Sequence, residues 1–252
     1  MKSIKYQSEQ LNCEISIDYF ISKPYKDKDM EAFYFLDGQN AFLDKSATYG
    51  RSIRALKHLD KAKLNYIAIA IHSPNKDQER LNMYSPFLIE KSYLENFNNN
   101  PLICQKFISE LENIIIPSIT TKYNVSRHHL IGSSLAASLA IYINSISKTF
   151  KSMCILSNSN FIFDKEMYKH LDNHKISKSE IYLGVGTNEV SDSLYSSKMY
   201  LEAFDKYKNY LTLINAKFIA KKIKFGKHNE KSWEKQFAVY LKTIIIKNSK
   251  NK

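Results

Sequence analysis

The sequence predicts an α/β protein with a mostly parallel central sheet and helices on both of its faces. Short apolar runs of strand length alternate with helical patterns along the chain, which is typical of strand–helix–strand units. Glycine is scarce, yet Gly38, Gly132, Gly186 and Gly226 all stand where a predicted strand ends. The chain has 252 residues, of which 44% are hydrophobic, and it shows neither an internal repeat nor a linker. We therefore expect one domain over residues 1–252.

Four strands are predicted in the first third of the chain. Residues 11–21 alternate between polar and apolar side chains, which predicts a strand that pairs with residues 2–7. Residues 32–36 and 65–71 are short apolar runs of the kind that is buried on both faces of a sheet.

A long helix is predicted after an asparagine-rich surface loop at 96–100. Pro101 is expected to open this helix, and Pro117 is expected to end or kink it. Its apolar positions recur at intervals of three and four residues: Ile103, Phe107, Leu111 and Ile114.

The second half of the chain repeats the alternation of strand and helix. The predicted elements are strands at 128–132, 151–157, 180–185 and 217–225, and helices at 135–146, 192–214 and 229–246. Parallel sheets place ligands at the carboxyl ends of their strands, so functional residues are expected there.

Composition excludes several classes of protein. The net charge is +12, but only four of the 37 basic residues are arginine and no nucleic-acid recognition motif is present, so we expect a lysine-rich surface and no nucleic-acid partner. No apolar run approaches the ~20 residues that span a bilayer, and residues 1–13 carry no readable signal peptide, which favours a cytoplasmic protein without a membrane partner. Cys13, Cys104 and Cys154 have no metal-site spacing and are expected to be reduced.

The strongest chemical signal is the segment Gly132-Ser133-Ser134-Leu135-Ala136, between a predicted strand and an apolar helix. A serine in such a tight turn holds its hydroxyl exposed, and small residues two positions before and after it relieve crowding. Ser134 is therefore the candidate nucleophile. The backbone N–H of Leu135, at the start of the helix, can point at a developing oxyanion.

A nucleophilic serine needs a base and an acid, which follow it in the order acid, then histidine. His228 comes directly after the last predicted strand and is the candidate base. Glu189 is the first carboxylate in the loop after strand 180–185, and Asp192 is the alternative acid. His170 and His174 lie four residues apart on a polar segment, which favours a solvated helix face over a metal site without a third ligand.

A second oxyanion donor is expected from a loop after an early strand. Asp37-Gly38-Gln39-Asn40 follows strand 32–36, and the backbone N–H of Gln39 is the candidate, although an ordinary Asp-Gly turn explains the same residues.

Four segments together resemble a known family: FYFLDGQNAF (33–42), IGSSLAASLAIYI (131–143), IYLGVGTNE (181–189) and GKHNEKSW (226–233). They are similar to the putative-esterase branch of the α/β-hydrolases, which includes esterase D-like enzymes, feruloyl esterases, mycolyltransferases and siderophore trilactone esterases. The resemblance runs from about residue 15 to 245 and implies an α/β-hydrolase fold with the same Ser134, His228 and Glu189 assignments. It also implies that Trp233 packs near the site and that Arg80 occupies a family-like position. Some members of the family resemble a Ser–His dyad without an effective acid, and this remains an alternative.

These residues predict a serine carboxylic-ester hydrolase that needs no cofactor and acts on a small-molecule ester. The substrate stays open between a generic acyl ester and a ferric-siderophore trilactone, and the positive charge favours an anionic ester. The alternative is a catalytically inactive binding module on the same fold. The sequence does not disclose the oligomeric state.

Overall fold

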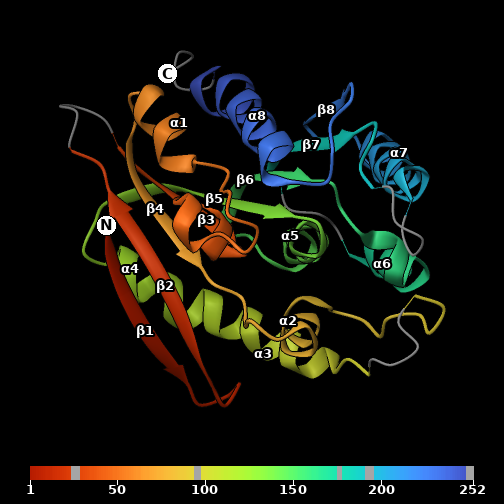
Figure 1. The fold of residues 1–252 in the computed structure, drawn as a ribbon, viewed down its shortest axis with the longest axis horizontal. Helices are drawn as coiled ribbons and strands as arrows, with labels where there is room; N and C mark the ends of the chain where they lie inside the picture. Colours follow the sequence, from red (N-terminus) through yellow and green to blue (C-terminus); the bar gives the residue numbers. More distant parts are fainter. Residues whose placement is uncertain (24–28, 94–97, 175–177, 191–195, 248–252) are drawn as a thin grey trace.

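An eight-stranded sheet crosses the molecule from one edge to the other (Figure 1). The computed structural model describes residues 1–23, 29–93, 98–174, 178–190 and 196–247. The strand order is β1-β2-β4-β3-β5-β6-β7-β8. The strands are β1 (Lys2–Ser8), β2 (Cys13–Ile21), β3 (Met30–Leu36), β4 (Asn65–Ile71), β5 (Val125–Ser133), β6 (Phe150–Leu156), β7 (Glu180–Gly186) and β8 (Phe218–Ile223).

The sheet is mostly parallel, and this confirms the predicted fold class. Strands β4, β3, β5, β6, β7 and β8 pair in parallel, whereas β1 pairs antiparallel with β2, and β2 pairs antiparallel with β4. The predicted pairing of residues 2–7 with 11–21 is confirmed. Every residue of β4 is buried, as expected for an apolar run between two helical layers.

Helices cover both faces of the sheet and form two apolar cores. The smaller core joins one face to α1 (Ala55–Lys61) and α8 (Glu230–Tyr240), which lie together in Figure 1. The larger core joins the other face to the remaining long helices. These are α2 (Asp77–Tyr84), α3 (Pro101–Glu110), α5 (Leu135–Ile146), α6 (Asp164–Asn173) and α7 (Ser197–Leu213).

The helix that begins at Pro101 continues past Pro117, so of the two expected outcomes, an end or a kink, Pro117 does not produce the end. A π-helical segment, Leu111–Ile115, follows α3 and leads directly into α4 (Ile116–Thr120). Pro117 lies in the first turn of α4, after this wider turn, where a residue without an N–H is tolerated. The chain is therefore helical as far as Thr120.

The asparagine-rich stretch is only partly a surface loop, which corrects a second expectation. Residues 96 and 97 lie outside the described residues. Asn99 is buried, and its side chain donates to the Phe87 carbonyl at 2.7 Å and accepts from the Ile89 N–H at 2.9 Å. The side chain of Asn100 caps α3 by accepting from the Leu102 N–H at 3.1 Å.

The C-terminal elements follow the predicted order. Helix α7 starts at Ser197 within the predicted 192–214 segment, and α8 continues into a π-helical segment, Leu241–Ile246. For helix α6 the sequence indicated a helix only through the spacing of His170 and His174, and its bounds were not predicted. None of the described helices is long and apolar enough to cross a lipid bilayer.

Candidate active site

Ser134 occupies a tight turn between β5 and α5, as the sequence predicts. Its backbone has φ 57° and ψ −126°, a conformation that costs a residue with a side chain about 1–3 kcal/mol. The Ser134 N–H donates to the Leu156 carbonyl at the end of β6, at 2.9 Å, and this bond fixes the turn to the sheet. A Cβ atom on Gly132 would overlap the Ala136 carbonyl, so the turn needs glycine at 132 and a small residue at 136.

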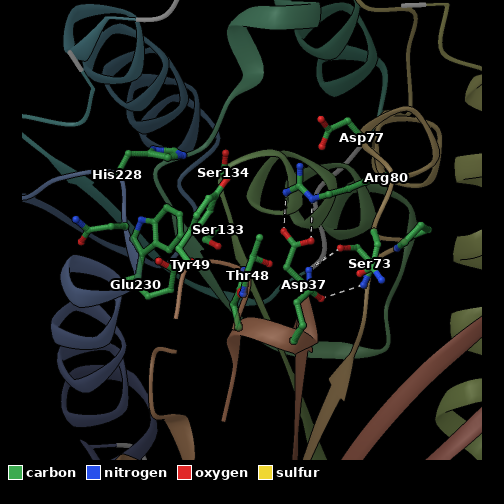
Figure 2. A pocket seen from close by; sticks show the side chains of 16 residues that line it. Asp37, Thr48, Tyr49, Ser73, Asp77, Arg80, Ser133, Ser134, His228 and Glu230 are labelled. Carbon is green, nitrogen blue, oxygen red and sulfur yellow. Dashed lines mark hydrogen bonds and ion pairs between the residues drawn. The ribbon is translucent and has the colours of Figure 1, made fainter. Parts of the chain in front are cut away.

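The Ser134 side chain faces a cavity of about 440 Å³ at the carboxyl ends of the strands (Figure 2). Within the described part of the chain its hydroxyl has one hydrogen-bond contact, with the Ser159 hydroxyl at 3.4 Å. The hydroxyl is therefore available to a molecule in the cavity.

His228 lies in the same cavity, and Figure 2 shows its imidazole directed toward Ser134. Its Nδ1 lies 2.7 Å from Glu189 Oε2, and its backbone N–H donates to the Glu189 carbonyl at 2.8 Å. The rings of Tyr200 and Trp233 pack against the imidazole, with centroid distances of 4.5 and 4.9 Å. Because Nδ1 donates to the carboxylate, Nε2 carries the lone pair and can accept a proton.

Glu189 is buried, and two donors besides His228 fix it. Its Oε1 accepts from the Ser157 hydroxyl at 2.7 Å and from the Gly186 N–H. The indole N–H of Trp233 donates to the Ser157 hydroxyl at 3.0 Å, so the hydroxyl is held from both sides. A Cβ atom on Gly186 would overlap the Gly226 carbonyl, and this glycine allows the two loops to meet.

The structure brings Ser134, His228 and Glu189 together from the ends of three strands. The alternative acid, Asp192, lies outside the described residues. Sequence reasoning missed Ser157 completely, and it placed Trp233 only through the family resemblance. The available signal for Ser157 was its position as a polar residue at the carboxyl end of a buried strand.

The two candidate oxyanion donors also border the cavity region. Gln39 lies in a 3₁₀ turn, Gly38–Asn40, directly after β3, and its side chain exchanges two hydrogen bonds with Ser73 at 2.9 and 3.2 Å. Leu135 is the first residue of α5. Among the described residues neither backbone N–H has a hydrogen-bond partner, which leaves both free to bind an anion.

An ion pair anchors the turn that carries Gln39. Arg80 on α2 donates to both Asp37 oxygens at 2.9 and 2.6 Å, and the Asp37 N–H donates to the buried Tyr84 hydroxyl at 2.9 Å. Asp37 itself has a φ of 52°, so these bonds stabilise a strained residue. The sequence alone gave no role to Arg80.

The cavity wall is acidic although the protein is basic. The described lining residues are Asp37, Gln39, Asn40, Thr48, Tyr49, Ser73, Pro74, Asn75, Asp77, Arg80, Ser133, Ser134, His228, Asn229, Glu230 and Trp233. None of these is a lysine, and the charge of Arg80 is balanced by Asp37. The basic rim that would suit an anionic ester is therefore missing from the described lining.

The remaining predicted candidates lie away from this cavity. His170 and His174 are on α6, where the His170 Nε2 lies 2.8 Å from the Ser145 hydroxyl and its ring packs on Tyr142 at 4.7 Å. His170 thus contacts α5, and the prediction that both histidines form a solvated face is wrong for it. Burial lowers the pKa of His170 to about 4. Within the described ranges, no three His, Cys, Asp or Glu side chains form a group that could hold a metal ion.

Comparisons with known proteins agree with this architecture. The model of the family described as "Esterase: Putative esterase" matches residues 8–244. No curated protein matches the sequence.

Solved structures with the same fold include three of similar size. An IroE-like serine hydrolase from Shewanella oneidensis has a TM-score of 0.75 at 16% identity, covering 96% of this chain and 80% of that chain. Siderophore hydrolase EstA from Aspergillus nidulans has a TM-score of 0.72 at 14% identity, covering 96% and 94%. The BES protein from Bacillus cereus has a TM-score of 0.71 at 18% identity, covering 94% and 93%. At these identities the likeness shows the α/β-hydrolase fold.

Proposed function

The chain belongs to the Putative esterase family and is therefore a serine esterase, and we propose that it hydrolyses carboxylic esters through an acyl-enzyme on Ser134. One observation carries the assignment of residues. A strained serine, with φ 57°, shares a cavity with a histidine whose Nδ1 is bound 2.7 Å from a buried carboxylate. This is the set of groups that nucleophilic acyl transfer requires.

The chemistry starts with proton transfer. His228 Nε2 accepts the proton of the Ser134 hydroxyl as its oxygen attacks the ester carbonyl carbon. The oxyanion that forms accepts hydrogen bonds from the Gln39 and Leu135 N–H groups. His228 then returns the proton to the leaving alcohol oxygen, which leaves an acyl group on Ser134.

Water completes the cycle. His228 takes a proton from a water molecule that attacks the acyl carbonyl, and the acid product leaves with Ser134 restored. Glu189 keeps the Nδ1 proton of His228 in place and stabilises the imidazolium formed in both halves of the reaction.

Small esters without a negative charge are the preferred substrate class over an anionic siderophore trilactone. The resemblance to siderophore hydrolases supports a trilactone as the second candidate. A ferric tris-catecholate is anionic, however, and the described cavity lining carries no lysine to attract it.

Labelling with a fluorophosphonate probe, followed by peptide mapping, tests the assignment. We expect the probe on Ser134, no labelling of Ser134→Ala, and normal labelling of Ser133→Ala, a neighbouring serine that lines the same cavity. A folded protein that takes up no probe would contradict the proposal and would favour the binding module.

A further inference from the structure

Glu230 is a buried residue in the wall of the cavity, and no described side chain forms a hydrogen bond or salt bridge with its carboxyl group. It opens α8 two positions after His228, it is 4% exposed, and Figure 2 includes it among the lining side chains. Apart from its own backbone N–H, the described chain gives its carboxyl no hydrogen bond or ion pair.

The other buried carboxyl groups of the described chain differ from Glu230 in this respect. Each of them has at least one hydrogen-bond donor: Glu31 has Arg127 and His129, Asp37 has Arg80, Glu110 has Ser8, Glu189 has His228 and Ser157, and Glu234 has Arg51 and His58. Glu230 is the exception within this set.

A carboxylate recessed in a cavity wall is less hydrated than one on the open surface, and no described side chain supplies a replacement donor to Glu230. Burial raises the pKa of Glu230, and this effect outweighs the opposing influence of its own backbone N–H and of the nearby His228 and Arg51. The charge of Asp37 raises the pKa further. A positively charged group in the cavity would pair with the Glu230 carboxylate. The relief of the desolvation penalty at Glu230 would then add to the binding free energy of that group.

The rest of the wall is suited to a cation. Asp77 at the start of α2 carries no ion pair in the described chain, and Arg80 is already bound to Asp37. Tyr49 and Trp233 supply aromatic faces, and Tyr49 is 82% exposed. Aromatic faces attract quaternary ammonium groups.

We propose that the cavity selects esters that carry a cationic ammonium group, and that Glu230 is the specificity-determining contact for that group. This inference rests on the proposed function, since it concerns the substrate of the Ser134 site.

Two isosteric esters test it. Acetylcholine carries a quaternary nitrogen where 3,3-dimethylbutyl acetate carries a carbon atom, so the two differ in charge and hardly in shape. We expect kcat/KM to favour acetylcholine by about 30-fold, and we expect Glu230→Gln to bring the ratio close to one. Asp77→Asn should lower the ratio less, because its side chain is exposed. The control is Glu166→Gln, which removes an exposed carboxylate of α6 outside the cavity and should keep the ratio.

Competition with the fluorophosphonate probe separates the two proposals. Choline should slow labelling of Ser134 in the wild-type protein more than 3,3-dimethylbutanol does, and this difference should vanish in Glu230→Gln. Labelling that both alcohols affect equally, or a preference for the neutral ester, overturns the cation selectivity and leaves the esterase proposal intact. A folded protein that neither reacts with the probe nor hydrolyses either ester overturns both.

Discussion

Within the described residues, a serine, a histidine and a glutamate are grouped at the carboxyl end of the sheet, and a second such group lies toward the amino end. At the carboxyl end, Glu189 holds His228, and the imidazole is directed toward Ser134. At the amino end, Glu31 Oε2 lies 3.0 Å from His129 Nε2, and His129 Nδ1 lies 2.7 Å from the Ser152 hydroxyl.

The group at the amino end has more hydrogen bonds to its serine than the group at the carboxyl end. The Ser152 hydroxyl is bound to His129 and to the Tyr240 hydroxyl, whereas the Ser134 hydroxyl has only the 3.4 Å contact with Ser159. Ser152, however, lies within strand β6 and is 2% exposed, and His129 is 1% exposed. The Ser152 hydroxyl is therefore buried and held by two partners, which makes it a poor nucleophile even though a cavity of about 260 Å³ borders Ser152 and His129.

The difference shows what separates a nucleophile from a buried polar network. Ser134 has a strained backbone and unpaired N–H groups beside its cavity. In the described structure a cavity of about 260 Å³ also borders Ser152, but Ser152 has neither of the other two features. At the amino end, the neighbouring side chains instead stabilise the charged form of Glu31. Burial alone would raise the pKa of Glu31, but the hydrogen bond from His129 and the charge of Arg127 hold this pKa below its usual value. We therefore assign it a role in stability.

The largest expected effect separates the two serines. Ser134→Ala should lower kcat/KM for p-nitrophenyl acetate by about 10⁴-fold or more, because it removes the nucleophile. Ser152→Ala should keep near wild-type kcat/KM and lower the free energy of unfolding by about 1–3 kcal/mol, because His129 and Tyr240 lose a buried partner. Equal loss of activity in both variants would contradict the distinction.

The two glutamates should separate activity from stability in the same way. Glu189→Gln should lower kcat by about 10³–10⁴-fold, because the amide no longer holds the required His228 tautomer. Glu31→Gln should cost about 3 kcal/mol of unfolding free energy, because it leaves Arg127 and His129 buried without their anion, and it should change kcat little. Urea denaturation and ester kinetics on both variants measure this. Full activity in Glu189→Gln would instead indicate a Ser–His dyad.

A smaller effect concerns Ser157, which we regard as a positioning residue for Glu189. Ser157→Ala should lower kcat by about 10–100-fold with KM nearly unchanged, because Glu189 loses one charge-assisted hydrogen bond. Ser157 has a φ of 51°, so Ser157→Gly is the matched control. Glycine should show the same loss in kcat and a higher stability than alanine, since it adopts positive φ without strain. If only the alanine variant loses activity, then the backbone rather than the hydroxyl is responsible.

The sequence predicted those parts of the site that depend on local pattern. Apolar runs such as 65–71 identified the strands, and the Gly132-x-Ser134-x-Ala136 spacing identified the turn, because steric crowding there is decided by residues next to each other in the chain.

Contacts between strand ends could not be predicted in this way. Ser157 meets Glu189, and Arg80 meets Asp37, only because the sheet order brings their loops together. A lone serine or arginine carries no periodic signal. The continuation of the helix past Pro117 was missed for a related reason: the π-helical turn that precedes Pro117 changes the hydrogen-bond pattern, and no residue type marks such a turn.

The smallest expected effect is a pH dependence of the free energy of unfolding. It comes from a histidine at the amino end of the sheet, near His129, and not from the catalytic end. Burial lowers the pKa of His128 to about 4, and its Nδ1 lies 2.9 Å from the Tyr34 hydroxyl at the same end of the sheet as His129. Below about pH 6.5 the unfolded chain binds a proton at this histidine and the folded chain does not, so the free energy of unfolding should fall as the pH drops from about 6.5 to 4. Urea denaturation at pH 7.5 and pH 5 should show a loss of up to about 2 kcal/mol from this residue, which His128→Gln should remove. An unchanged pH slope in that variant would show that other groups, such as the buried His129, set the acid limit of the fold.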